Sequence, residues 1–456
     1  MKQVIFFLLL LFSLSLSAQS IITGYHSSSF ILQSSSNASA FPQTKFVFGF
    51  PGLSNINISA ALPMSLNDVL EKGLDDSLRI NIPSISSSLT NYNLVSTSFR
   101  NQLIHFGLKL GAKKNVFVYV GDEIVVEGGL QFSDDFIKYF TIGNANFINQ
   151  QMSFNSQKIE FTAYNSFYVG TSLKLNDDFV VGARIKVLNG ISNLHTRKLN
   201  FGFYTDSNAS AVYATTITSD VLIHTSGQGA LTDSIEFDPM KNLGLALDLG
   251  MSYKFSDDLS ASFALNDLGS INWHQSNNTS YTSDGELEFE LVGLTQSSAD
   301  PEDLDAQLET ILDSLTNFIE IQEASGSYRT KLNPNLFLGV SYSLSSSHSF
   351  SFLYNRKKYI DKSLKIFSIG YQYKLREKFE LLTSCQIIDG VSSLASGFVW
   401  SPGPLQLHLI FDNILMADIF DAKNFFIQMG LSFHFDLNND NSNKKTYLYL
   451  NKLSRF

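Results

Sequence analysis

The charged residues whose spacing could support chemistry lie in segments where apolar and polar residues alternate. Arg184 and Lys186 are two positions apart, so in an extended segment their side chains share one face. The same polar face of other alternating segments carries four more charges, namely Glu160, Lys174, Asp248 and Lys254. Such a set can form a buried ion-pair network or line a polar permeation path, and both interpretations stay open at this point.

Residue patterns for catalysis or cofactor binding are missing from the sequence. The eight histidines are dispersed, and none forms an HxH or HxxxH pair that would suggest a local metal site. The single cysteine, Cys385, excludes a disulfide within the chain, a zinc ribbon and a CxxC redox motif. No GxSxG, P-loop or GxGxxG sequence occurs. We therefore expect a protein that is not an enzyme and that has no cofactor.

The elements that must position these charges are β-strands. In Leu243–Phe255 every second residue is apolar, so Leu247 belongs to an apolar face and Ala246 to a small or polar face. Ile159–Leu175 repeats the pattern, Asn176, Asp177 and Asp178 form a turn, and the pattern resumes at Phe179–Val187. Each such segment thus has one wholly apolar face.

Further segments with this pattern predict strands along the rest of the chain. They are Thr44–Phe50, Asn55–Leu62, Leu103–Leu110, Val116–Val126, Leu199–Tyr204, Tyr213–Ile223, Leu259–Leu265, Leu287–Leu294, Leu336–Leu344, Phe350–Arg356, Phe367–Leu375, Phe379–Ile387, Val391–Val399, Leu405–Phe411 and Phe425–Phe435. Many connections are short and polar, whereas Ser270–Asp284 and Thr295–Gly326 are long.

Short turns at one rim and long loops at the other are typical of outer-membrane β-barrels. Charged residues are only 16% of the chain, mean hydropathy is +0.03, and no apolar run outside the N-terminus approaches 18 residues. We predict an all-β protein, a transmembrane antiparallel barrel of about 14 strands, with 12 or 16 as alternatives because bacterial barrels use even numbers. A secreted β-sandwich or solenoid is the competing fold. The net charge of −10 argues against nucleic acid as a partner.

The N-terminus predicts export. Residues 1–18 combine Lys2, the apolar run Val4–Leu16 and the small pair Ser17-Ala18, which is typical of a secretory signal peptide. A short membrane anchor is the alternative. The predicted organisation is a signal peptide over residues 1–18, a barrel over residues 19–435 in the cell outer membrane, and a polar tail over residues 436–456.

Three segments have special roles in this prediction. Phe425–Phe435 ends the strand pattern on a phenylalanine, as closing strands of outer-membrane barrels do, and we expect the barrel-assembly machinery to recognise it. Apolar residues recur at helical spacing between Leu304 and Ile319, after a plausible N-cap at Asp300, and predict one short helix in the longest loop. A second helical turn is predicted at Phe136–Phe140.

Several stretches resemble a Bacteroidota outer-membrane family of unknown function, DUF5723. They are Asn37–Pro42, Phe50–Ile56, Gly143-Asn144 with Tyr164, Gly170 and Ser172, Gly182–Gly190, and Asn266–Trp273. The family is similar to fatty-acid-transporter-type barrels and to PorV-type barrels of the type IX secretion system. The resemblance implies fold and location and transfers no site residue.

Two functions follow as expectations. The first is a channel or transporter for small hydrophobic molecules, with outer-membrane lipid around it. The second is a non-transporting structural or accessory barrel, a subunit of a secretion or surface-attachment machine.

Overall fold

The computed structural model describes most of the chain between residues 22 and 435. The described ranges are 22–72, 78–111, 114–142, 144–207, 214–227, 241–274, 278–290, 320–323, 326–375, 378–412 and 423–435. The predicted signal peptide, the predicted helix at 304–319 and the predicted tail lie outside these residues. No described helix has the length and apolar character needed to cross a membrane.

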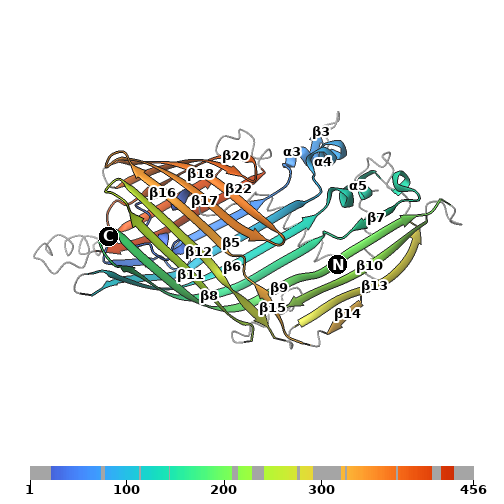
Figure 1. Cartoon of the computed structure of the whole chain (residues 1–456), viewed down its shortest axis with the longest axis horizontal. Coiled ribbons are helices and arrows are strands. Elements are labelled where there is room, and N and C mark those ends of the chain that lie inside the picture. Colours follow the sequence, from blue (N-terminus) through green and yellow to red (C-terminus); the bar gives the residue numbers. More distant parts are fainter. Residues whose placement is uncertain are drawn as a thin grey trace, which may run out of the picture.

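Antiparallel strands close into a 14-strand barrel, which confirms the predicted fold class (Figure 1). The strands are β5 (Asn93–Leu110), β6 (Val116–Phe132), β8 (Lys158–Lys174), β9 (Phe179–Thr205), β11 (Leu243–Lys254), β12 (Leu259–Trp273), β17 (His348–Tyr359), β18 (Lys362–Leu375), β19 (Phe379–Ile388), β20 (Val391–Trp400), β21 (Leu405–Asp412), β22 (Asn424–Phe435) and two interrupted strands. The interrupted strands are β1 (Phe46–Gly49) with β2 (Asn55–Ala61), and β15 (Tyr328–Lys331) with β16 (Asn335–Ser343).

The first strand closes the barrel. Both β1 and β2 pair with β22 on one side and with β5 on the other, so they are two parts of one strand. The sequence predicted them as separate strands because residues 50–54 interrupt the alternation. These residues bulge out of the ladder, where the amide of Phe50 and the carbonyl of Leu53 still bond to Leu431.

The exposed and buried side chains of the wall match the predicted alternation of outward and inward residues. On β11, Leu245 is 64% exposed and Leu249 is 38% exposed, whereas Ala246 is 5% exposed and Asp248 is fully buried. The exposed apolar side chains form an outer belt that continues around the barrel, for example at Ile369, which is 63% exposed. This belt accounts for the low charge of the chain together with its neutral mean hydropathy.

A charge placed in the outer belt tests these faces. Ile369 lies six residues above the turn after β18, near the middle of the belt, so Ile369→Arg should cost about 2–4 kcal/mol in a lipid bilayer. The measurement is the temperature at which heat abolishes the faster gel migration of the folded barrel. Ser346→Arg, in an exposed turn, is the control and should leave that temperature unchanged. Equal behaviour of the two variants would refute the assigned faces.

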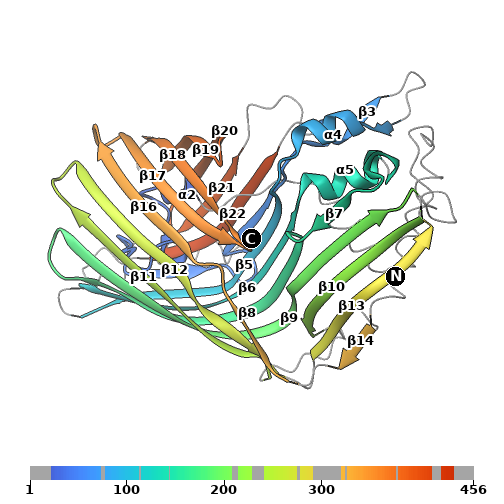
Figure 2. The ribbon, with the colours of Figure 1, turned by 45° about the vertical axis from the view of Figure 1, so that its right-hand side comes forward.

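The wall is much taller on one side of the barrel. β9 is one strand of 27 residues, although the sequence predicted two strands at Phe179–Val187 and Leu199–Tyr204. Its first part pairs with β11, and its later part pairs with β10 (Ala214–Ser226). The sheet therefore forks at β9. One branch of it, hereafter the second sheet, consists of β7 (Gln151–Phe154), β9, β10, β13 (Asn278–Glu290) and β14 (Glu320–Glu323) and extends beyond the barrel (Figure 2).

The predicted loop at Ser270–Asp284 is wrong. β12 continues to Trp273 and β13 begins at Asn278, so most of the predicted loop is strand. The residues from Asn278 to Gly285 are polar or small and give no apolar alternation. Their backbone nevertheless pairs with β10 along its length, and tertiary pairing rather than side-chain pattern makes this strand.

Short helices and a small hairpin lie at the end of the barrel with the long loops, hereafter the long-loop rim. They are α3 (Leu66–Val69), β3 (Leu70–Lys72), β4 (Leu78–Ile80), α4 (Ile82–Ser88), α5 (Asp134–Ile142) and η2 (Asn144–Phe147). α5 confirms the predicted helical turn at Phe136–Phe140, and its Tyr139 packs against Phe154 and Phe203 of the second sheet. The opposite end, hereafter the short-turn rim, carries tight turns such as residues 176–178 and 256–258.

Candidate functional site in the barrel lumen

The segment before the first strand lies inside the barrel. This segment, residues 22–44 and hereafter the plug, contains the short helices α2 (Ile22–Tyr25) and η1 (Gln33–Ser35). Its side chains and backbone bond to inward-facing residues of strands all around the wall. The partners include Ser384 of β19 for Thr23, Ser262 of β12 for Tyr25, Ser368 of β18 for His26, Gln406 of β21 for Ser29 and Ile31, and Ser172 of β8 for Ser39.

Glycines on the inner wall make room for the plug. A Cβ atom at Gly182 of β9 would meet the backbone carbonyl of Ala38, and one at Gly250 of β11 would meet the amide oxygen of Asn37. Gly370 of β18 faces the ring of His26 in the same way. The absence of a side chain at these positions lets plug backbone and wall backbone approach closely. Two of the stretches that carry the family resemblance, Asn37–Pro42 and Gly182–Gly190, therefore contact each other here.

Beside the plug, charged side chains of neighbouring strands form a buried network. Arg184 Nε lies 2.5 Å from Asp248 Oδ2, and Lys186 Nζ lies 3.0 Å from the same oxygen. Lys186 Nζ also lies 2.6 Å from Asp267 Oδ1 and 3.8 Å from Glu123 Oε1. The side chains of Lys186 and Asp248 are at most 1% exposed, so Lys186 is the buried centre of three ion pairs.

The network continues across the lumen toward β5 and β17. Arg100 Nη2 lies 2.7 Å from Asp267 Oδ2 and 3.5 Å from Glu127 Oε1, and Lys357 Nζ lies 2.7 Å from that same Glu127 oxygen. The cations are Arg100, Arg184, Lys186 and Lys357, and the carboxylates are Glu123, Glu127, Asp248 and Asp267. Four charges of each sign balance, which is the condition under which buried ions are tolerated.

Of the six charges that the sequence singled out, Arg184, Lys186 and Asp248 come together in this network. The other three lie elsewhere, each near an end of its strand. Glu160 pairs with His195 at 3.2 Å, Lys174 pairs with Asp177 at the short-turn rim, and Lys254 is exposed at the same rim.

Five network residues escaped the sequence reasoning, for different reasons. Glu123 and Glu127 lie at alternate positions of β6, on the same inward face as Val125. The alternation could therefore have identified them as inward-facing charges. Arg100 and Asp267 fell just outside the predicted strands, whose true extents are longer. Lys357 follows the predicted strand Phe350–Arg356, and only its pairing with Glu127 across the lumen reveals its role.

A backbone irregularity turns Asp267 inward. The register between β11 and β12 shifts between Leu247 and Leu249, and Asp267 there adopts a positive φ of 62°. Both Asn266 and Asp267 are consequently buried, and the amide of Asp267 donates to Asp248 Oδ1 at 2.7 Å. Because of the bulge, the carboxylate of Asp267 joins the network. Regular alternation along β12 would have placed this side chain on the outer face.

The rest of the Asn266–Trp273 stretch anchors the wall. A Cβ at Gly269 would meet Ala246 and the carbonyl of Leu245, so the strands approach closely there. Trp273 is fully buried, packs over Gly190 of β9, and donates its indole N–H to Thr330 Oγ1 at 2.8 Å. Residues 266–273 therefore position Asp267 in the network, and their Trp273 packs where the sheet forks at β9.

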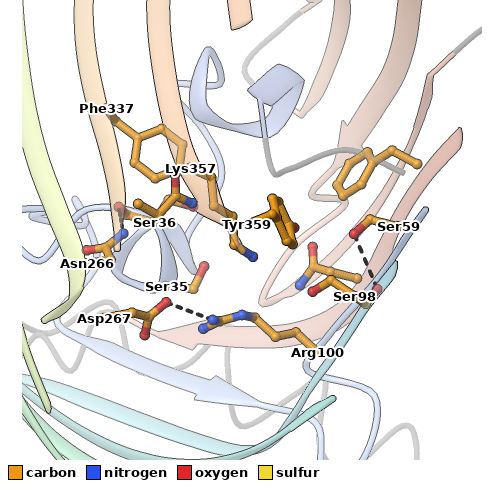
Figure 3. A pocket seen from close by; sticks show the side chains of 13 residues that line it. Ser35, Ser36, Ser59, Ser98, Arg100, Asn266, Asp267, Phe337, Lys357 and Tyr359 are labelled. Carbon is orange, nitrogen blue, oxygen red and sulfur yellow. Dashed lines mark hydrogen bonds and ion pairs between the residues drawn. The ribbon is translucent and has the colours of Figure 1, made fainter. Parts of the chain in front are cut away.

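A small polar cavity lies between the plug and the network (Figure 3). Its volume is about 40 Å³, enough for one or two water molecules. Ser35 and Ser36 of the plug line it together with Arg100, Asp267 and Lys357. The described residues contain no group of three or more His, Cys, Asp or Glu side chains arranged to hold a metal ion. The polar side chains that line the cavity thus come from both the plug and the network.

Fold and site together define a β-barrel whose lumen contains the plug. The chain belongs to the family described as "Family of unknown function (DUF5723)", whose model matches residues 39–412. No curated protein matches the sequence.

Three solved structures resemble this chain at very low sequence identity. The toluene transporter TbuX of Ralstonia pickettii is 9% identical, with 89% of this chain and 94% of that chain covered and a TM-score of 0.41. The toluene transporter TodX of Pseudomonas putida is 10% identical, with 92% and 95% covered and a TM-score of 0.43. A FadL homologue of Pseudomonas aeruginosa is 10% identical, with 91% and 96% covered and a TM-score of 0.43.

Proposed function

We propose that this protein is an outer-membrane channel for small hydrophobic molecules, held closed by the plug in the conformation described here. The exposed apolar belt of a closed barrel supports the membrane setting, because such a surface is stable only against lipid. The predicted signal peptide supports export to that membrane.

The hydrogen bonds between plug and wall carry the gating part of the proposal, beside the apolar contacts that Ile22, Phe30 and Leu32 of the plug make. Hydrogen bonds to wall side chains hold the plug at many points, for example Ser39 to Ser252 at 2.8 Å and Asn266 to the carbonyl of Ser36 at 2.7 Å. Water can replace such bonds at little net cost, since a typical one contributes only about 1 kcal/mol. A segment held in this way can leave the lumen without unfolding the barrel.

Apolar residues nearer the long-loop rim support a hydrophobic cargo. Tyr359, Ile360, Leu364 and Ile388, at the ends of β17 to β19, pack with Leu94 of β5 on the inner side. The same cluster includes Ile22 of the plug and packs against Tyr25, so a hydrophobic molecule that enters from this rim would meet apolar side chains beside the plug. Binding there would exclude water from apolar surface, which favours uptake from a dilute solution.

A second candidate is an accessory barrel that transports nothing. The balanced ion network favours it, because fixed charges that bridge β5, β6, β9, β11, β12 and β17 stiffen the wall and occupy the lumen permanently. In that case the plug is a structural core element. The two candidates differ in whether the plug moves.

A disulfide between plug and wall tests that difference. Ser39 of the plug and Ser252 of β11 have their hydroxyl oxygens 2.8 Å apart, so cysteines at both positions, in a Cys385→Ser background, should form a reversible crosslink. Cells that express this variant should take up the hydrophobic dye N-phenylnaphthylamine slowly when oxidised and severalfold faster after dithiothreitol. The Ser39→Cys single variant is the control and should not respond to dithiothreitol. Uptake that is equal in both redox states would favour the accessory barrel.

A further inference from the structure

Exposed cations gather on the outer wall at one side of the long-loop rim. They are Arg329 and Lys331 of β15, Arg356 and Lys358 of β17, and Lys365 of β18, hereafter the basic patch. All five side chains are exposed, and they alternate with buried residues such as Thr330 and Lys357 that face inward. The basic patch therefore points away from the lumen and has no part in the network described above.

The basic patch begins where the outer belt ends. The outward face of β17 reads Phe350, Phe352 and Tyr354 and then changes to Arg356 and Lys358. On β18 the exposed Ile369 and Phe367 are followed by Lys365 in the same way. On both strands the outward face thus changes from apolar to cationic at one level, since Arg356 and Lys365 are register partners.

That level fits the headgroup region of a lipid bilayer. Arg356 is eight residues above the first residue of β17, His348, which is about 26 Å along a strand and about 20 Å in height at a tilt of about 40°. The apolar belt of an outer-membrane barrel is about 25 Å tall. The cations therefore lie at the upper border of the belt, beside the phosphates of the adjoining leaflet.

The pairing of cations within the patch indicates an anionic partner. Arg356 and Lys365 are directly opposite each other on adjacent strands, an arrangement that destabilises a sheet when both charges have the same sign. Within the described part of the chain, no carboxylate forms an ion pair with any of the five. Arg356 bonds to Ser363 at 3.1 Å and Arg329 bonds to Asn272 at 2.8 Å, both of them neutral partners.

The wall on the opposite side of the barrel has no such cluster of outward cations among its described residues at a comparable height. There the outward polar residues are Asp122 of β6, Asn165 of β8 and Asn189 of β9, and the amide of Asn165 donates to Asp122 at 2.9 Å. A border with the headgroups can thus be made with neutral or acidic residues. Among the described residues at this height, the cations are thus concentrated on β15, β17 and β18.

We propose that the basic patch binds the phosphate groups of a phosphorylated lipid headgroup in the leaflet at the long-loop rim. Arg356 and Lys365 would contact one phosphate together, because their outward positions are neighbours, and Arg can form two parallel hydrogen bonds to it. Lipid rather than a soluble anion is the occupant because the patch continues directly from the lipid-facing belt. This inference rests on the membrane setting proposed above.

The test measures lipid retention by the full-length barrel. Wild type and Arg356→Gln/Lys365→Gln are reconstituted into nanodiscs of phosphatidylcholine that contain lipid A with two phosphates, extracted, and examined by native mass spectrometry for bound lipid A. Removal of two surface cations weakens the attraction to anionic lipid, so the double variant should bind lipid A at least tenfold more weakly. Lys198→Gln/Lys378→Gln removes two exposed cations outside the patch and should retain lipid A as wild type does.

The outcomes separate the two proposals. Failure of all three proteins to enter nanodiscs would overturn the membrane setting, whereas insertion with equal lipid A retention by all three would overturn the lipid site alone. Inorganic phosphate, added as a competitor, should not displace lipid A at millimolar concentration. If it does so, the patch is a site for soluble anions and the lipid assignment is wrong. Heat-modifiable gel migration establishes that each variant is folded.

Discussion

Gly182→Val is expected to convert the closed barrel into a steadily conducting pore. Even the first carbon of the new side chain would meet the carbonyl and carbon of Ala38 and the amide of Ser39, all of them backbone atoms that cannot rotate away. Valine is favoured in strands, so β9 and the barrel should remain intact. The plug must therefore shift out of its place, and planar-bilayer recordings should show large open channels where wild type shows none.

Gly128→Val is the matched control for this experiment. Gly128 is also in a long wall strand, β6, but a Cβ there would meet the Thr97 hydroxyl, the end of a flexible side chain, and lies away from the plug. This variant should remain closed like wild type. A folded Gly182→Val barrel without conductance would show that the lumen stays filled when the plug is displaced, and would favour the accessory barrel over the channel.

Lys186→Met should destabilise the barrel by about 3–5 kcal/mol. Methionine fills a similar volume but leaves Asp248 and Asp267 without their shared cation, at side-chain exposures of 0% and 5%. Arg184 still pairs with Asp248 and Arg100 with Asp267, but the network then holds three cations against four carboxylates. One buried negative charge is left uncompensated, which costs about that much. The measurement is urea-induced unfolding in detergent micelles, followed by tryptophan fluorescence from the two tryptophans.

Two further variants separate charge from packing. Lys186→Met/Asp267→Leu removes one charge of each sign, so it should recover a large part of the lost stability. Lys254→Met changes an exposed lysine at the short-turn rim and should alter the free energy of unfolding by less than about 0.5 kcal/mol. A loss of equal size at Lys254 would mean that the effect has nothing to do with burial in the network.

The alternation of apolar and polar residues is enough to predict the barrel. On β11 it places Leu247 outward and Ala246 inward, and the exposed and buried residues of the structure agree. It does not reveal what the inward face contacts. Ala246 is packed with Leu188, Ile271 and Trp273, so a large side chain at this inward position would be as disruptive as a charge in lipid.

The candidate site is predictable only in part from the sequence. The alternation of inward and outward residues identified Arg184, Lys186 and Asp248 because they lie within regular strands. It missed Asp267, since a bulge reverses the alternation there, and a bulge depends on the neighbouring strand. The plug was missed entirely, because residues 22–44 have no period that distinguishes a segment inside a lumen from an ordinary polar linker.

The sequence by itself thus determined the fold class and the side of the wall on which each regular strand residue lies, because a strand in lipid must alternate and a belt must be apolar. The tertiary structure adds that the plug lies in the lumen, that eight charges from six strands balance, and that Gly182 and Gly250 contact the plug. These contacts join residues far apart in the chain, and their energies depend on distance and burial. Neither quantity is a property of local sequence.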